Sequence, residues 1–325
     1  MKNNFLMNPG PTNTRFKTKY AQWVGSDVCH RTPEFYKVLD NTKNLLLDRF
    51  GTKNAHIAIL GGSGTTAMEA MISSLINTKV VVINAGIYGQ RAIDMMKVYN
   101  IKYTEVKCKT IDDLKVNKSY KNVYFVENET TTGEEFNVEA MAKIYPNARL
   151  FIDSTSAFGS SDYTHVLDRV AALSFCSNKC LQSTPGLGIV IWKKDLKINA
   201  KTYYCDLSKY IGKDIAFTLP VQSVYALQKT LQITTNNKKL FSRRTSTMIK
   251  ELRKLGIKCI NRYPSNSISG FQHPTMSYEE LKEHLYKKGI VIYAGIAGIK
   301  NSFRLSTMSV LFDKKFKKLI RSLNG

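Results

Sequence analysis

The chain alternates between short runs of β-branched and apolar residues and longer amphipathic stretches. A Gly-rich turn opens a helix near residue 65, and residues 220–231 also have helical spacing. Such alternation is typical of a mostly parallel sheet covered by helices on both faces, so we expect an α/β fold. Strands are predicted for residues 56–60, 79–84, 122–126, 150–153, 169–176 and 188–193.

The pattern changes after a long basic helix predicted at residues 237–255. Ser277 and Glu280 have the spacing of a capping box at the start of a later helix. We therefore expect a large domain over residues 15–235 and a smaller α/β domain over residues 236–325, to which the N-terminal segment 1–14 contributes. Short strands at 258–261, 267–271, 289–294 and 302–306 alternate with helices at about 278–287 and 313–323.

Composition favours a globular protein, because 43% of the 325 residues are hydrophobic and 22% are charged. No apolar run approaches the roughly 18 to 20 residues needed to cross a bilayer. The apolar stretch at the N-terminus is too short for a signal peptide. We expect a cytoplasmic protein with no membrane partner.

The net charge of +23 raises the question of a nucleic-acid partner. The lysines are spread along the whole chain, however, with no basic-aromatic cluster and no nucleic-acid motif. We interpret the charge as a solvated lysine-rich surface, which would also help to attract an anionic substrate. The six cysteines show no paired metal spacing, so we expect reduced thiols and no metal.

A Gly-rich turn follows the first predicted strand and consists of Gly61, Gly62, Ser63 and Gly64, with Thr65 and Thr66 behind it. Glycines let the backbone approach an anion, and the N-terminus of the following helix offers free N–H groups. The turn matches neither the Walker nor the dinucleotide fingerprint. It is suited to a phosphate, although an ordinary turn explains the pattern equally well when it is taken alone.

Two ionisable residues stand at the ends of other predicted strands. Asp153 ends the strand at 150–153, and Lys179 follows the strand at 169–176. Taken alone, Asp153 is best interpreted as a helix cap, and Lys179 is only one of many lysines in the chain. A lysine held between two core strands is partly desolvated, which favours the neutral amine needed for a Schiff base. Together with the phosphate cradle they match the needs of pyridoxal phosphate: a lysine, an acid for the pyridine nitrogen and a phosphate site.

At this point the sequence resembles a known family, the fold-type I, class V pyridoxal-phosphate aminotransferases, and within it the 2-aminoethylphosphonate–pyruvate transaminases. The resemblance covers nearly the whole chain and predicts a seven-stranded, mostly parallel sheet in the large domain. Its motifs are residues 8–12 (NPGPT), 62–65 (GSGT), 88–91 (YGQR), 129–133 (ETTTG), 152–159 (IDSTSAFG), 177–180 (SNKC), 217–220 (FTLP) and 303–306 (FRLS).

The resemblance implies roles for single residues. Lys179 would bind the cofactor covalently and shuttle a proton, and Asp153 would pair with the pyridine nitrogen. Tyr88 would stack on the ring, with an ordinary loop tyrosine as the alternative. Further cofactor contacts are implied for Ser63, Gly64, Thr65, Thr130, Thr155 and Asn178.

The resemblance also implies a homodimer with shared sites, in which Thr218 reaches the phosphate of the neighbouring subunit. Arg304 would bind the substrate carboxylate as a bidentate fork. A surface ion pair is the alternative for Arg304, which its apolar neighbours Phe303 and Leu305 disfavour. Arg31 and Pro11 are further candidates for substrate binding.

The amino donor is less clear from the sequence. Residues 129–133 and 177–180 resemble the phosphonate enzymes and point to 2-aminoethylphosphonate as the donor and pyruvate as the acceptor. Residues 30–35 (HRTPEF) are closer to alanine–glyoxylate and serine–pyruvate aminotransferases. Another small-amine aminotransferase, a cysteine desulfurase-like lyase using Cys205, and a non-enzymatic binding protein are the remaining alternatives.

Overall fold

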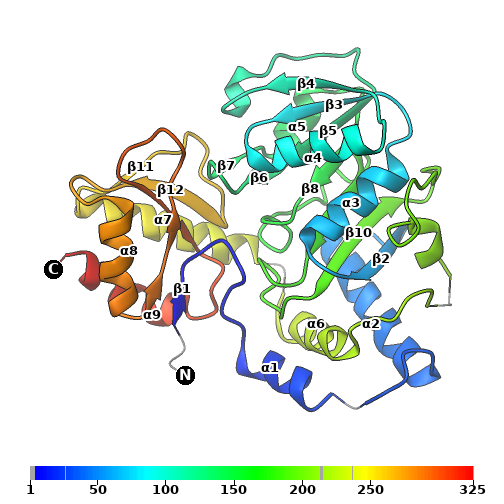
Figure 1. The fold of residues 1–325 in the computed structure, drawn as a ribbon, viewed down its shortest axis with the longest axis horizontal. Coiled ribbons are helices and arrows are strands. Elements are labelled where there is room, and N and C mark those ends of the chain that lie inside the picture. Colours follow the sequence, from blue (N-terminus) through cyan, green and yellow to red (C-terminus); the bar gives the residue numbers. More distant parts are fainter. Residues whose placement is uncertain (1–3, 26, 213–214, 236, 325) are drawn as a thin grey trace.

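The computed structural model describes residues 4–25, 27–212, 215–235 and 237–324. A large sheet with its helices forms one part of the molecule, and a smaller sheet with its own helices lies beside it (Figure 1). Residues 1–3 of the predicted N-terminal segment and residues 236 and 325, the two ends of the predicted smaller domain, lie outside the described residues.

The large sheet has seven strands in the order β2-β10-β9-β8-β5-β3-β4. β10 runs antiparallel to both of its neighbours, and the other pairs are parallel. The predicted α/β fold with a mostly parallel seven-stranded sheet is therefore confirmed. The strands are β2 (Ala55–Gly61), β3 (Val80–Asn84), β4 (Tyr103–Lys107), β5 (Asn122–Val126), β8 (Arg149–Asp153), β9 (Val170–Cys176) and β10 (Leu187–Lys193).

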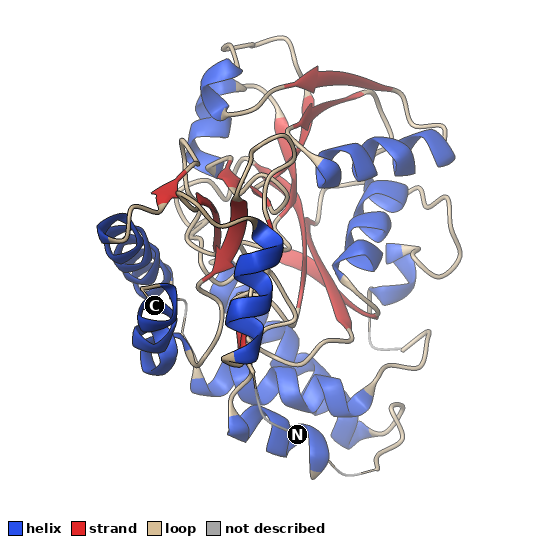
Figure 2. Cartoon of the chain, turned by 60° about the vertical axis from the view of Figure 1, so that its left-hand side comes forward, coloured by secondary structure: helices blue, strands red, loops and turns tan. Residues whose placement is uncertain are grey.

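Helices cover both faces of this sheet (Figure 2). Side chains alternate across the strands, so Ile57 and Ile59 of β2 pack in one cluster while Ala58 and Leu60 pack in the other. The helices are α1 (Phe16–Trp23), α2 (Pro33–Phe50), α3 (Gly64–Leu75), α4 (Ile87–Val98), α5 (Val138–Ile144) and α6 (Val221–Ile233), with single 3-10 turns η1 (Ile111–Asp113) and η2 (Leu207–Tyr210).

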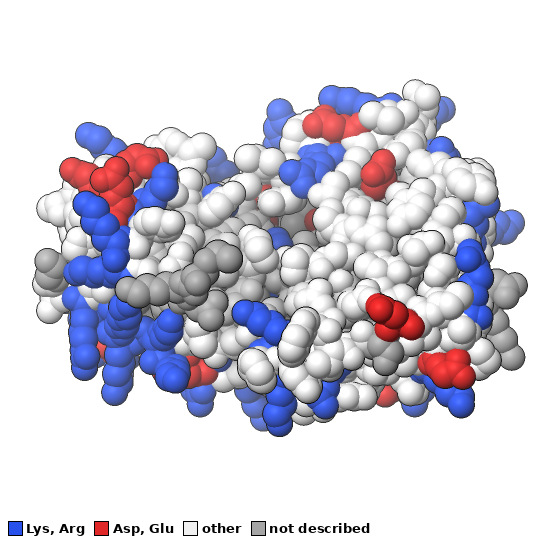
Figure 3. Space-filling view, turned by 60° about the horizontal axis from the view of Figure 1, so that its bottom comes forward, with Lys and Arg blue, Asp and Glu red and all other residues white. Residues whose placement is uncertain are grey.

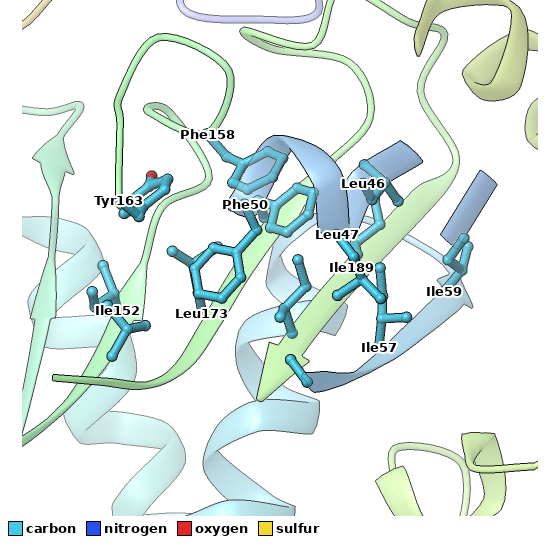
Figure 4. Close-up of a cluster of buried hydrophobic side chains, with 14 of the residues drawn as sticks. Leu46, Leu47, Phe50, Ile57, Ile59, Ile152, Phe158, Tyr163, Leu173 and Ile189 are labelled. Carbon is cyan, nitrogen blue, oxygen red and sulfur yellow. The ribbon is translucent and has the colours of Figure 1, made fainter. Parts of the chain in front are cut away.

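Helix α2 shows how the sequence builds one of these layers. Pro33 stands in its first turn, and Gly51 ends it in a left-handed conformation with φ of 104°. Leu46 and Phe50 lie on the buried side of the helix and face the sheet (Figure 4). Burying each such side chain stabilises the fold by about 1.5–3 kcal/mol.

The smaller part is built on a four-stranded antiparallel sheet in the order β11-β12-β15-β14. Its core includes Phe5 and Met7, because β1 (Phe5–Leu6) pairs in parallel with β13 (Ile290–Val291). The capping box of Ser277 and Glu280 is confirmed at the start of α8. The other elements are α7 (Lys238–Lys254), β11 (Lys258–Cys259), β12 (Ile268–Gln272), α8 (Tyr278–Lys287), β14 (Tyr293–Ala294), β15 (Ser302–Ser306) and α9 (Phe312–Leu323).

A short hairpin, β6 (Asn128–Glu129) and β7 (Glu134–Glu135), joins the two parts. The buried carboxylate of Glu134 accepts hydrogen bonds from the backbone N–H groups of Arg262 (2.8 Å) and Tyr263 (2.9 Å). The backbone N–H of Glu135 donates to the carbonyl of Tyr263 at 2.9 Å. These contacts fix how the smaller sheet sits against the large one.

No helix in the described ranges is long and apolar enough to span a bilayer. Lys and Arg side chains are spread around the rim of the face seen in Figure 3, rather than gathered in one stripe.

Candidate active site

The candidate site lies at the edge of the large sheet where the parallel strands end, next to the smaller part of the molecule. A cavity of about 440 Å³ opens there, and its lining comes from both parts of the chain. In Figure 3 the surface is hollowed between the two parts, and basic and acidic side chains are visible inside the hollow. In open α/β sheets this edge is the usual ligand site. The lining residues are Pro9, Gly10, Pro11, Ser63, Gly64, Thr65, Met68, Ile87, Tyr88, Arg91, Thr130, Thr131, Asp153, Thr155, Cys176, Asn178, Lys179, Tyr293 and Arg304.

Lys179 stands in the loop between β9 and β10 and reaches into the cavity. Its Nζ donates to Ser156 Oγ at 3.0 Å, and that oxygen is 2.7 Å from Thr130 Oγ1. Gly10 lies against the stem of the lysine: a Cβ there would come within 3.2 Å of Lys179 Cγ, and φ is +131°. The amine is thus held in place but is not tied to a carboxylate.

Asp153 ends β8, and only 2% of its surface is exposed. Its Oδ1 accepts a hydrogen bond from the backbone N–H of Thr155 at 3.0 Å. Burial raises the pKa of Asp153, while the nearby hydroxyl and backbone N–H of Thr155 and the charges of Lys179 and Arg91 oppose that rise. A cationic ring N–H in the cavity would compensate this buried carboxylate.

The Gly-rich turn forms the N-terminus of α3. Ser63 is its N-cap, and its Oγ accepts the backbone N–H of Thr65 at 3.2 Å. Gly64 is packed against Thr155: an added Cβ would lie 2.7 Å from Thr155 Cγ2. The turn therefore places the N-terminus of α3 and the hydroxyl side chains of Ser63 and Thr65 at the cavity wall, as suits an anion site.

Tyr88 lies in the first turn of α4, not in a loop. The carboxylate of Glu129 accepts the backbone N–H groups of Tyr88 (3.1 Å) and Gly89 (3.2 Å), so a residue from β6 caps this helix. Lys179 Nζ lies 5.8 Å from the centroid of the Tyr88 ring. This position beside the lysine supports the predicted stacking role.

Arg304 on β15 brings the smaller part of the molecule to the cavity. Its Nε donates to the carbonyl of Ala294 at 2.6 Å, and its Nη1 donates to the carbonyl of Thr130. The side chain is buried, its guanidinium lies 5.0 Å from the Tyr293 ring centroid, and burial lowers its pKa. No carboxylate of the described residues pairs with it within 4 Å, which argues against a surface ion pair.

Two predicted residues are not brought to the cavity of this chain. Arg31 instead donates to the carbonyl of Ile215 at 3.4 Å, and Thr218 is exposed on the surface. In the segment around Arg31, Pro33 begins α2 and Phe35 is fully buried in the core. Arg31 therefore does not line the cavity of this chain, and its expected role in substrate binding stays a prediction.

Sequence reasoning missed four residues at the site: Arg91, Glu129, Ser156 and Tyr293. Arg91 follows Tyr88 by three positions, so both lie on the same side of α4, and this spacing was visible in the sequence. Ser156 and Glu129 belong to motifs that were recognised without a role for these positions. Nothing in the sequence pattern pointed to Tyr293.

The side chains of the cavity also match what pyridoxal phosphate would need. The Oγ1 of Thr155 is shielded from solvent and has no hydrogen-bond partner among the described residues, although its side chain faces the cavity. Such an atom calls for a polar ligand. With an amine at Lys179, a carboxylate at Asp153 and an anion site at 63–65, the residues fit this cofactor.

Metal-dependent chemistry and a cysteine desulfurase-like reaction have less support from the structure. No group of three or more potential metal ligands occurs in the described ranges. Burial raises the pKa of Cys205 to about 11, which is the opposite of an activated thiol. A cysteine desulfurase-like reaction at this residue is therefore disfavoured.

Comparisons with known proteins identify the family of this chain. The sequence model described as "Aminotransferase class-V" matches residues 12–311. A 2-aminoethylphosphonate–pyruvate transaminase of Bacillus cereus (strain ATCC 10987 / NRS 248) is 26% identical and covers 98% of this chain and 96% of its own. One from Bacteroides fragilis is also 26% identical, with 98% of each chain covered.

Solved structures share the fold. The aspartate aminotransferase of Thermus thermophilus superposes with a TM-score of 0.89 at 22% identity, over 99% of this chain and 98% of its own. The alanine–glyoxylate aminotransferase of Nostoc sp. gives 0.87 at 20% identity, over 100% and 95%. This chain belongs to the class V aminotransferase family, and it is an aminotransferase whose cavity residues fit pyridoxal phosphate.

Proposed function

We propose that this enzyme transfers the amino group of 2-aminoethylphosphonate to pyruvate and releases phosphonoacetaldehyde and L-alanine. The observation that carries the proposal is Arg304, a buried guanidinium at the cavity without a carboxylate partner among the described residues. Both substrates are small anions that such a group can bind in turn. Curated relatives with this activity match nearly the full length of the chain.

In this proposal Arg304 anchors the anionic end of each substrate. Its Nε and Nη1 are held by the carbonyls of Ala294 and Thr130, while neither of these bonds uses Nη2. The guanidinium is thus oriented before the substrate arrives, which lowers the entropy lost on binding. Tyr293, whose ring lies against it, closes the same end of the cavity.

Lys179 and Asp153 carry the chemical steps at the other end. Bound pyridoxal phosphate supplies the carbonyl carbon that accepts the amino group and the ring that stabilises negative charge at the substrate carbon. The amine of Lys179 removes and returns the proton at that carbon. The buried carboxylate of Asp153 holds a proton on the ring nitrogen, and Ser156 and Thr130 orient the lysine.

An amine-donor screen with pyruvate tests the donor. Each amine is supplied with pyruvate at several concentrations, and alanine formation gives kcat/KM for 2-aminoethylphosphonate, serine and 2-aminoethyl phosphate. Alanine is tested with glyoxylate in a separate assay that measures glycine formation. We expect the highest kcat/KM for 2-aminoethylphosphonate. If serine, or alanine with glyoxylate, reacts faster, the donor assignment is wrong while the aminotransferase chemistry stands.

The structure offers no separate support for the alanine–glyoxylate alternative. The pattern at 30–35 that favours it serves to start α2 and to fill the core, as Thr32, Pro33 and Phe35 show. The screen above still includes both reactions.

We also propose a homodimer with shared sites. Helix α1 exposes Phe16 (78%) and Trp23 (82%), and Ile87 at the cavity is 60% exposed. Large exposed apolar side chains gathered on one helix, as Phe16, Tyr20 and Trp23 are on α1, are typical of a subunit interface. Thr218 is exposed and free to reach the phosphate site of a second copy. Sedimentation velocity at micromolar concentration should give the mass of two chains, and a mass of one chain would contradict the proposal.

The six cysteines are all free, which supports our proposal of a cytoplasmic location. Fractionation of cells that produce the protein should recover it with cytoplasmic markers, and recovery with the membranes or the secreted fraction would contradict it.

A further inference from the structure

Arg91 lies in the cavity wall and has no part in the steps described above. It stands on α4, three residues after Tyr88. Its Nη1 donates to Thr65 Oγ1 at 3.0 Å, and its Cζ lies 4.7 Å from the centroid of the Tyr88 ring. One guanidinium therefore touches both the Gly-rich turn and the aromatic ring.

The charge of Arg91 acts on the buried carboxyl of Asp153 and lowers its pKa, but Arg91 contacts no carboxylate directly among the described residues. None of the ion pairs shorter than 4 Å among them includes Arg91. The nearest acid on its own helix, Asp94, accepts a hydrogen bond from Gln90 at 2.9 Å and pairs with Lys97 at 3.6 Å. Glu129 already accepts the N–H groups that begin α4. A partly buried arginine without a carboxylate is suited to an anionic ligand.

The direction of the Arg91 side chain indicates which anion it would bind. Thr65 belongs to the turn at 63–65, where the N-terminus of α3 and the hydroxyl of Ser63 face the cavity. Lys179, the other cation nearby, is held by Ser156. Arg304 is held by carbonyls on the side of the smaller sheet. Arg91 is thus the cation whose hydrogen bond points at the phosphate cradle.

We propose that Arg91 binds the phosphate group of the cofactor and, through the same guanidinium, holds the Tyr88 ring over the cofactor plane. The inference rests on the proposed placement of the phosphate at Ser63–Thr65, and it is independent of the amino donor. A guanidinium can donate to Thr65 and to a phosphate oxygen at once, because its N–H groups form a planar fork. Arg91 is a cofactor-binding residue in this view, while Lys179 and Asp153 keep the chemical roles.

The test compares the affinity of the cofactor-free enzyme for pyridoxal phosphate and for pyridoxal, which lacks the phosphate. Both aldehydes can react with Lys179, so the ratio of their dissociation constants isolates the phosphate contribution. We expect Arg91→Gln to weaken binding of pyridoxal phosphate by about tenfold or more and binding of pyridoxal by less than about threefold. Lys97→Gln removes an exposed charge from the same helix and should change neither affinity.

Equal losses for both ligands would overturn the proposal, because Arg91 would then act only through Tyr88. Unchanged affinities would overturn it as well. If the glutamine variant does not fold by circular dichroism, Arg91→Lys gives the same test: its selectivity for the phosphate should fall by about threefold, since a lysine cannot reach Thr65 and the phosphate together. Selectivity equal to that of the wild type would contradict the role of the guanidinium. A wild-type enzyme that binds both ligands equally well would instead show that the phosphate placement itself is wrong.

Discussion

The two sides of the cavity are built in different ways. On the side of the large sheet, Asp153 and Lys179 follow directly from strands whose register is fixed along the whole core. On the other side, Arg304 comes from a separate sheet that is attached through the β6–β7 hairpin and Glu134. The proposed chemical groups therefore come from one sheet, while the proposed substrate anchor depends on how a second sheet sits against it. This division suggests that cofactor chemistry and substrate recognition can be altered separately.

Removal of the lysine amine should have the largest effect. We expect Lys179→Ala to lower kcat by at least about 1,000-fold, because no other amine among the cavity-lining residues can replace it. Mass spectrometry after borohydride treatment should show a covalent cofactor adduct in the wild type and none in the variant. The control is Lys194→Ala, which replaces an exposed lysine just beyond β10. It should keep both the wild-type kcat and the covalent adduct. A persisting adduct in Lys179→Ala would place the cofactor on another residue.

Removal of Arg304, the proposed substrate anchor, should weaken substrate binding without weakening cofactor binding. We expect Arg304→Gln to lower kcat/KM for both the amine and pyruvate by about 10- to 100-fold, since a charge-assisted fork is lost. Affinity for pyridoxal phosphate should change by less than about threefold. Arg253→Gln, an exposed arginine on α7, serves as the matched control. A loss of cofactor affinity as large as the loss in kcat/KM would show that the two sides are not separable.

A substitution in the β6–β7 hairpin, where the two parts join, should have the smallest effect. That effect is on the stability of the fold, and it depends on pH. Burial, with a contribution from Glu127, raises the pKa of Glu135 to about 7 from an ordinary value of 4.5. A carboxyl whose pKa is raised by folding does not destabilise the folded protein below pH 4.5, because it is protonated in both the folded and the unfolded state. Its cost grows as the pH rises from 4.5 to 7 and is constant above 7. Glu135→Gln should therefore stabilise the protein by about 1–3 kcal/mol at pH 8 and by almost nothing at pH 4.5.

Urea unfolding at both pH values measures this difference. Glu283→Gln, an exposed acid on α8, is the control and should show no such pH dependence. Equal stability of Glu135→Gln and wild type at pH 8 would mean that the ionised carboxylate is accommodated at the junction without cost.

Much of the large sheet was predictable because its strands are buried runs with clear ends. β9 is buried at every position, and the prediction for 169–176 differs from the observed Val170–Cys176 by one residue. β4 was not predicted, since it lies at the edge of the sheet and its residues are only partly buried. Helices α4 and α5 were not predicted either. The helical spacing of α4 is visible, but Gly86 gives it no side-chain cap of its own, and Glu129 supplies one from across the fold.

The sequence by itself determined the fold and the family, and it singled out Lys179 and Asp153, the two residues that we propose for the chemical steps, because local strand ends and ordered motifs identify them. The predicted boundaries at residues 15 and 236 remain a prediction. Tertiary structure alone decided which distant groups meet: Arg91 with Thr65, Glu129 with the start of α4, and Arg304 with Thr130. It also decided that the guanidinium of Arg31 donates to the backbone carbonyl of Ile215. Such pairings depend on sheet order and on how the two parts pack, which no local pattern records.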